Sequence, residues 1–157
     1  MGFDSLPLRN AQRLAHDAAL KGSLPGIRAY IRSLDFLGSF SEATQTPEEE
    51  LQGFKNTAYE AVVNPKSSPD NTVAESILDG IRTFAQIIEF QLTHNITITA
   101  TDRTQMNRLV EIAEQEMAQG NLAFTEASFA IMQTQRKLTA MDQPTPPELP
   151  DPKPQGP

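Results

Sequence analysis

Residues 72–92 carry the strongest structural signal in this chain, an apolar pattern too wide for a helix with one buried face. Thr72 and Glu75 have the spacing of a capping box, in which a hydroxyl and a carboxylate satisfy free amides at a helix N-terminus. Apolar residues then recur every three or four positions, and Ile87 and Phe90 widen the stripe. The stripe consists of Val73, Ile77, Ile81, Phe84, Ala85, Ile88 and Leu92. Since such a helix is usually enclosed by several neighbours, we expect it to be central.

Five further segments have the pattern of amphipathic helices with recognisable ends. The Ser-Leu-Pro tripeptides at 5–7 and 23–25 combine a capping hydroxyl with a proline that the first helical turn tolerates. Thr46 and Glu49 have capping-box spacing. Together the signals predict helices over residues 5–22, 23–38, 46–64, 72–94, 101–120 and 125–141. The expected fold class is all-α, a bundle of about five or six amphipathic helices.

The segment at residues 95–101 interrupts the helical pattern. Ile96, Ile98 and Ala100 alternate with polar residues, mostly threonine, and β-branched residues favour an extended backbone. A single strand cannot satisfy its own backbone hydrogen bonds. Two alternatives follow. Either Ile96 and Ile98 belong to a strand that joins the sheet edge of another chain, or the segment is an extended linker packed on its own subunit.

Proline divides the chain into two parts, because seven of its 12 prolines lie between residues 144 and 157. We expect a helical domain at residues 1–141 and a proline-rich, acidic, flexible tail at 142–157, disordered or in the polyproline II conformation. Pro147 and Pro150 belong to Pro-x-x-Pro spacings, which aromatic grooves of other proteins can bind. The alternative is a tail that acts only as a spacer or solubilising segment.

The formal net charge of −7, from 20 acidic and 13 basic side chains, argues against nucleic acid or an anionic membrane as a partner. The chain has no cysteine, which excludes disulfides, thiol catalysis and thiolate metal sites. No stretch approaches the ~18 apolar residues of a membrane span, and the first residues lack the pattern of a secretory signal. We therefore expect a location in the cytoplasm of a cell or an infected host, or within an assembled particle.

Catalytic and cofactor-binding patterns are absent from the sequence. The eight glycines are dispersed, so neither a phosphate-binding loop nor a dinucleotide fingerprint can be assembled. The two histidines, His16 and His94, fall on different predicted helices, and neither follows a glutamate at the spacing of a helical metal site. We expect His16 at the surface or at a helix end, and His94 near a helix C-terminus. The predictions are therefore no enzyme, no metal and no cofactor.

The last predicted helix has too many large apolar residues for one face. Either it is surrounded within the monomer, or part of its surface meets a protein partner. The candidate partner-binding residues are Ile96, Ile98, Phe124, Phe129, Ile131, Met132, Pro147 and Pro150. The functional hypothesis is a non-enzymatic structural or assembly protein that oligomerises or docks onto a larger complex, such as a virion or a secretion apparatus. The alternative is a soluble regulatory or chaperone-like adaptor that binds a client protein transiently.

Overall fold

The computed structural model describes residues 6–37, 47–65 and 72–142, which form six α-helices and no strand. In chain order they are α1 (Leu6–Leu20), α2 (Leu24–Leu37), α3 (Pro47–Val63), α4 (Val73–Thr93), α5 (Ala100–Ala118) and α6 (Thr125–Asp142), with a short 3-10 helix, η2 (Leu122–Phe124), before α6. The predicted all-α fold is confirmed. Of the predicted tail, the residues after Asp142, with Pro147 and Pro150, lie outside the described residues. Within the described ranges, no helix is both long enough and apolar enough to cross a membrane.

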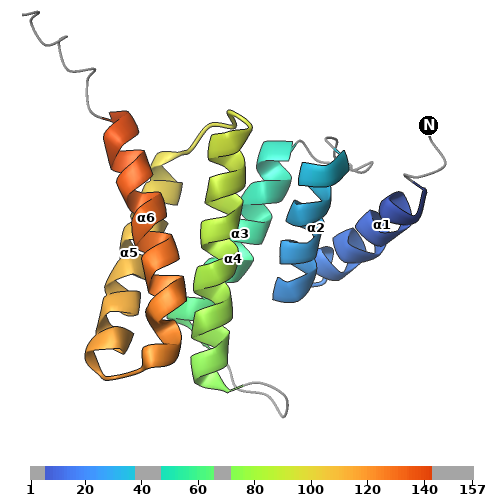
Figure 1. Ribbon diagram of the computed structural model, residues 1–157. Helices are drawn as coiled ribbons and strands as arrows, with labels where there is room; N and C mark the ends of the chain where they lie inside the picture. The colour runs from blue at the N-terminus through green and yellow to red at the C-terminus, as the bar shows by residue number, and fades with distance from the viewer. Residues whose placement is uncertain (1–5, 38–46, 66–71, 143–157) are drawn as a thin grey trace, which may run out of the picture.

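The helices pair as three hairpins, α1–α2, α3–α4 and α5–α6, which lie side by side in a row (Figure 1). α2, α4 and α6 form one layer, with α4 in contact with both of its neighbours. α3 and α5 pack behind α4 and α6, while α1 lies against α2 at one end of the row. The predicted bundle is therefore an open row of hairpins with two ends, and α4 lies at its centre.

Two apolar cores hold the row together, one at each junction between neighbouring hairpins. Ile87 and Phe90 of α4 lie in the core shared with the first hairpin. Ile81, Phe84 and Ile88, on another side of α4, lie in the core shared with the third hairpin. The prediction of a central helix is confirmed, and the width of its apolar stripe is explained by two separate neighbours.

Most helix ends lie where the sequence placed them. The capping box of Thr72 and Glu75 is present at the start of α4. The backbone amide of Gly26 donates to Ser23 Oγ at 3.0 Å, so this serine caps α2. Gly22, which follows α1, has a φ of +92°, a left-handed conformation that side chains disfavour. Thr46, the predicted cap of α3, lies outside the described residues.

The extended segment is shorter than predicted. Only residues 96–99 lie between the turn after α4 and the first residue of α5, so positions 100 and 101 are helical rather than extended. The reason is a second capping box: Asp102 N donates to Thr99 Oγ1 at 3.1 Å, and Thr99 N donates to Asp102 Oδ2 at 3.0 Å. Because this box satisfies the amides at residues 99 and 102, α5 begins at Ala100 instead of Thr101.

Helices α3 and α4 approach each other closely at Gly80. A Cβ atom at Gly80 would lie 2.5 Å from Val62 Cγ2 and 2.6 Å from the Ala58 carbonyl oxygen. By contrast, a Cβ atom at Gly53 on the exposed side of α3 would meet nothing within 4 Å. Gly80 and Gly53 therefore have different roles, since of these two only Gly80 permits close contact with a neighbouring helix.

Replacing each glycine by alanine tests this difference. We expect Gly80→Ala to lower the free energy of unfolding by about 1–3 kcal/mol, because the added methyl group overpacks the α3–α4 contact. Gly53→Ala should raise it by about 0.5–1 kcal/mol, because alanine restricts the unfolded chain and favours helix. Urea denaturation of both variants provides the measurement, and equal effects of the two substitutions would contradict the close approach.

The two-sided burial of α4 predicts a large cost for removing Phe84, which has no exposed surface. We expect Phe84→Ala to lower the free energy of unfolding by about 3–5 kcal/mol, through lost burial and the cavity left behind. Phe129→Ala is the matched control, because that ring is 60% exposed and should change stability by less than about 0.5 kcal/mol. Chemical denaturation compares the two, and a near-neutral Phe84→Ala would contradict the central position of α4.

Candidate functional site

The structure separates the predicted partner-binding residues of η2 and α6 into two groups. Phe124 and Ile131 are fully buried in the core between the second and third hairpins, and Met132 packs against that core. The expectation that Phe124 and Ile131 face outward is therefore wrong, because they fill the contact of α6 with α4 and α5. Phe129 points away from this core and is 60% exposed. One side of α6 is thus enclosed within the chain, and the other is open to solvent.

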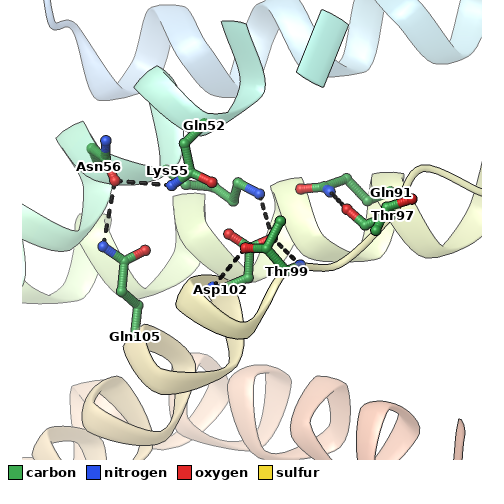
Figure 2. Close-up of polar contacts among 8 residues, drawn as sticks. All are labelled: Gln52, Lys55, Asn56, Gln91, Thr97, Thr99, Asp102 and Gln105. Carbon is green, nitrogen blue, oxygen red and sulfur yellow. Dashed lines mark hydrogen bonds and ion pairs between the residues drawn. The ribbon is translucent and has the colours of Figure 1, made fainter. Parts of the chain in front are cut away.

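The extended residues after α4 pack within this chain. Asn95 adopts a φ of +58°, and the Ile96 amide donates to the Gln91 carbonyl oxygen at 2.9 Å. Gln91 Nε2 donates to the Thr97 carbonyl oxygen at 2.9 Å (Figure 2). Ile96 packs against the core of the first junction and Ile98 against the core of the second. This packing favours the linker alternative over a strand donated to another chain.

A buried ion pair lies at the junction of α3 and α5. Lys55 Nζ donates to Asp102 Oδ2 at 2.7 Å, and the two side chains are 2% and 0% exposed (Figure 2). The same Asp102 oxygen accepts the Thr99 amide in the capping box of α5. Asp102 Oδ1 is buried and has no hydrogen-bond partner. The carboxylate thus caps one helix and binds the lysine of another, so it ties the start of the third hairpin to the second.

The buried environment of Lys55 disfavours the charged form of its side chain. Burial lowers the pKa of Lys55 below its ordinary value, while the hydrogen bond and the negative charge of Asp102 act in the opposite direction. Nearby, Asn56 Oδ1 accepts hydrogen bonds from Gln52 at 3.0 Å and from Gln105 at 3.3 Å, which adds an α3–α5 contact at the surface (Figure 2). The polar groups around Lys55 therefore hold helices α3 and α5 together.

A second buried polar cluster joins α1 to α2 and α3. His16 Nε2 lies 2.5 Å from Glu50 Oε2, and Tyr30 Oη donates to Glu50 Oε1 at 3.3 Å. The His16 ring also contacts the rings of Tyr30 and Phe54, with centroids 4.5 and 6.5 Å away. The expectation of a surface or helix-end His16 is wrong, because the residue is 7% exposed and pairs with a carboxylate from α3.

Both clusters have a counterpart in the sequence of α3, where a charged residue falls on the apolar side of the helix. On α3, the buried positions are Leu51, Phe54, Lys55, Ala58 and Val62, so the lysine occupies a place in the apolar stripe. Glu50 likewise lies one turn before Phe54 on the buried side. A charged residue at such a position requires a partner of opposite charge. The sequence alone did not identify Asp102 or His16 as that partner, because both come from distant helices.

Several other titratable groups of the described residues form separate pairs at or near the surface. His94 is the C-cap of α4, as its predicted place near a C-terminus implies, and its Nε2 lies 3.2 Å from Asp35 Oδ1 at the surface. Glu111 pairs with Arg108 at 3.1 Å, and Glu116 accepts a hydrogen bond from Asn121. Within the ranges that the structure describes, no group of three or more His, Asp or Glu residues is placed to hold a metal ion.

A shallow groove of about 480 Å³ runs between α4 and α6. Small residues form its apolar part, and charged and amide side chains line the rest. The lining residues are Arg82, Ala85, Gln86, Glu89, Glu126, Ala127, Ala130, Gln133, Thr134 and Lys137. Glu89 spans the groove, because it accepts a hydrogen bond from Thr134 at 2.9 Å and pairs with Lys137 at 2.9 Å.

Exposed apolar side chains gather at the two ends of the row. Among the described residues, the large exposed ones are Leu8, Leu14, Leu20, Phe36, Val73, Leu122, Phe129 and Met141. Of these, only Val73 belongs to the central hairpin. At the first end, α1 buries Gln12, His16 and Ala19, while Leu14 on the opposite side is 67% exposed. The first helix therefore packs through polar and small side chains, while Leu8, Leu14 and Leu20 remain exposed.

Comparison with known proteins adds no family: no family model, curated protein or solved structure matches this chain.

Lys55→Met tests the energetic role of the buried pair. We expect it to lower the free energy of unfolding by about 3–5 kcal/mol, because Asp102 would remain charged and buried without its partner. The double variant Lys55→Met/Asp102→Asn should recover most of this loss, since it removes both charges while the amide oxygen keeps the capping function. Thermal or urea denaturation gives the comparison. A double variant as unstable as Lys55→Met would contradict the account.

Proposed function

We propose that this chain is a non-catalytic protein-binding module, a structural or assembly component that acts through the two ends of its helical row. One observation carries the proposal: the large exposed apolar side chains lie almost entirely on the terminal hairpins, while the central hairpin is covered on both sides. In stacked helical hairpins, an end that remains in solvent is expected to have a polar outer surface. Here both ends carry exposed leucine or phenylalanine, and covering them would release further hydrophobic free energy.

The buried polar groups support a non-catalytic role. Lys55 and Asp102 bind each other, and Glu50 is engaged by His16 and Tyr30. These contacts link one helix to another, and the groups within them are almost fully buried. Their place in the fold is that of structural ties between hairpins. The cysteine-free, acidic composition fits action in the cytoplasm of a cell or infected host, or within an assembled particle.

A second candidate function is a transient adaptor that holds a peptide segment of a client protein. The groove between α4 and α6 favours it, because the floor of Ala85, Ala127 and Ala130 leaves room for a chain. Arg82 and Gln133 at the groove are exposed and carry donors suited to a peptide backbone or an acidic side chain. Under this alternative the end faces would matter less than the groove.

Affinity capture with surface variants tests the proposal. The wild-type chain, tagged and expressed in its native cell, should retain one or more proteins, the untagged chain included. We expect a variant carrying Leu14→Glu, Phe36→Glu and Phe129→Glu to lose at least nine-tenths of that recovery, because charges would replace the apolar contacts at both ends.

Val73→Glu is the matched control, because Val73 is exposed but belongs to the central hairpin, and glutamate suits the first turn of a helix. Arg82→Glu/Gln133→Ala probes the groove in the same experiment. Equal recovery by the triple variant and the wild type would contradict binding through the ends. A loss confined to the groove variant would establish the adaptor instead.

A further inference from the structure

The two ends of the row differ in charge. Residues 6–37, which form the first hairpin, contain five basic and two acidic side chains. Residues 100–142, which form the third, contain four basic and six acidic ones. With neutral histidine the first hairpin is thus net positive and the third net negative. Opposite net charge on two surfaces of one chain favours their mutual approach and disfavours the approach of either surface to its own copy.

The outward side of the first hairpin combines apolar and basic side chains. Leu14 and Phe36, 67% and 71% exposed, lie on the sides of α1 and α2 opposite to those that pack on the second hairpin. Arg32 lies one helical turn before Phe36, whereas Arg13 precedes Leu14 in the chain and lies about 100° around α1 from it; both arginines are exposed, as is Asp17 one turn after Leu14. We define Leu14, Phe36, Arg13 and Arg32 as the N-terminal end face. It is carried by α1 and α2, the hairpin at one end of the row (Figure 1).

The outward side of the third hairpin combines apolar and acidic side chains. Leu122 and Phe129 are 76% and 60% exposed, and Phe129 lies opposite the buried Ala127 and Ile131 on α6. On α5, Glu111 and Glu114 are exposed on the side opposite the buried Leu109, and Glu111 also pairs with Arg108 of its own chain. We define Glu111, Glu114, Leu122 and Phe129 as the C-terminal end face. It is carried by α5, η2 and α6, which form the other end of the row (Figure 1).

From these observations we propose that the occupant of each end face is a second copy of this chain, bound head to tail. This proposal rests on the proposed function and names its partner. The N-terminal end face of one copy packs on the C-terminal end face of the next, so that the row of hairpins continues across the chain boundary. Leu14 and Phe36 meet Leu122 and Phe129, while Arg13 and Arg32 face Glu111 and Glu114.

Head-to-tail contact has a consequence that a two-fold dimer lacks. A two-fold interface uses the same patch on both partners, and would place the arginines of one N-terminal end face against those of the other. A heterologous contact uses two different patches, so each bound copy still offers one free face. Association therefore continues beyond the dimer, as an open row or a closed ring.

Complementation between two defective chains tests the proposal directly. The N-face variant carries Leu14→Glu/Phe36→Glu, and the C-face variant carries Leu122→Lys/Phe129→Lys. Each variant alone should stay at the monomer mass of 17.3 kDa in light scattering, while the wild type exceeds twice that mass as its concentration rises. An equimolar mixture should form a complex of two chains and no more, because one intact N-terminal face meets one intact C-terminal face.

The charged residues provide a second, independent readout. Arg13→Glu/Arg32→Glu should abolish association, and mixing this chain with a Glu111→Arg/Glu114→Arg chain should restore it. Val73→Glu serves as the control and should associate like the wild type. Circular dichroism verifies that every variant keeps the helical content of the wild type. Raising the salt concentration from about 0.05 to 0.5 M should weaken wild-type association, because the facing charges are exposed.

Two outcomes would overturn the proposal. A wild-type chain that remains monomeric at about 1 mM has no second copy as its partner. Dimers that are lost in the N-face variant but unchanged in the C-face variant would show a two-fold contact instead. Neither outcome removes the proposed function, since capture of a different protein that depends on Leu14, Phe36 or Phe129 would still establish binding through the ends.

Discussion

The whole row depends on α4, because this helix buries apolar side chains on two sides at once. Ile87 and Phe90 pack toward the first hairpin, and Ile81 and Phe84 toward the third. α3 lies against α4 with a backbone contact at Gly80 that leaves no room for a side chain. The first and third hairpins each gain their core by contact with the second. Stability in such a fold is a sum of hairpins and nearest-neighbour junctions, so α4 contributes to both junctions.

The terminal hairpins follow from the same constraint. Each has a covered side toward the centre and an open side, and α1 shows how incomplete the covering is. It faces α2 and α3 with Gln12, His16 and Ala19, while Leu14 remains in solvent. His16 then needs Glu50, because a buried imidazole without a hydrogen-bond partner would be costly, and Tyr30 Oη donates to the other oxygen of the same carboxylate. The first helix therefore buries polar side chains on its inner side and exposes apolar ones on its outer side.

The sequence predicted the elements of this fold well and the tertiary contacts poorly. Helix positions could be found because capping residues and apolar periodicity are local; Thr72 with Glu75 and Gly22 lie where expected. The arrangement of the hairpins in a row, and the burial of Phe124 and Ile131, depend on which side of α6 meets α4. Periodicity gives the number of apolar sides on a helix, but it does not say which neighbour covers each one.

The candidate site shows the same division. Phe129 was predicted as a partner-binding residue and is exposed. Leu14 of α1 and Phe36 of α2 are exposed as well, but they were not among the predicted partner-binding residues. The Lys55–Asp102 and His16–Glu50 contacts were not predicted, although Lys55 falls in the apolar stripe of α3. Matching that lysine to Asp102, 47 residues later in the chain, requires knowledge of how α3 and α5 cross.

The Lys55–Asp102 pair also restricts how the third hairpin can be aligned. Apolar helix surfaces tolerate sliding, since one aliphatic group can replace another with little change in energy. A shift of α5 along α3 by one helical turn, about 5.4 Å, would leave an ammonium and a carboxylate in apolar surroundings without each other. Because Asp102 also belongs to the capping box of α5, the register of α5 relative to α3 is set at the first turn of α5. Misaligned packings of the third hairpin on the second are thereby made unfavourable.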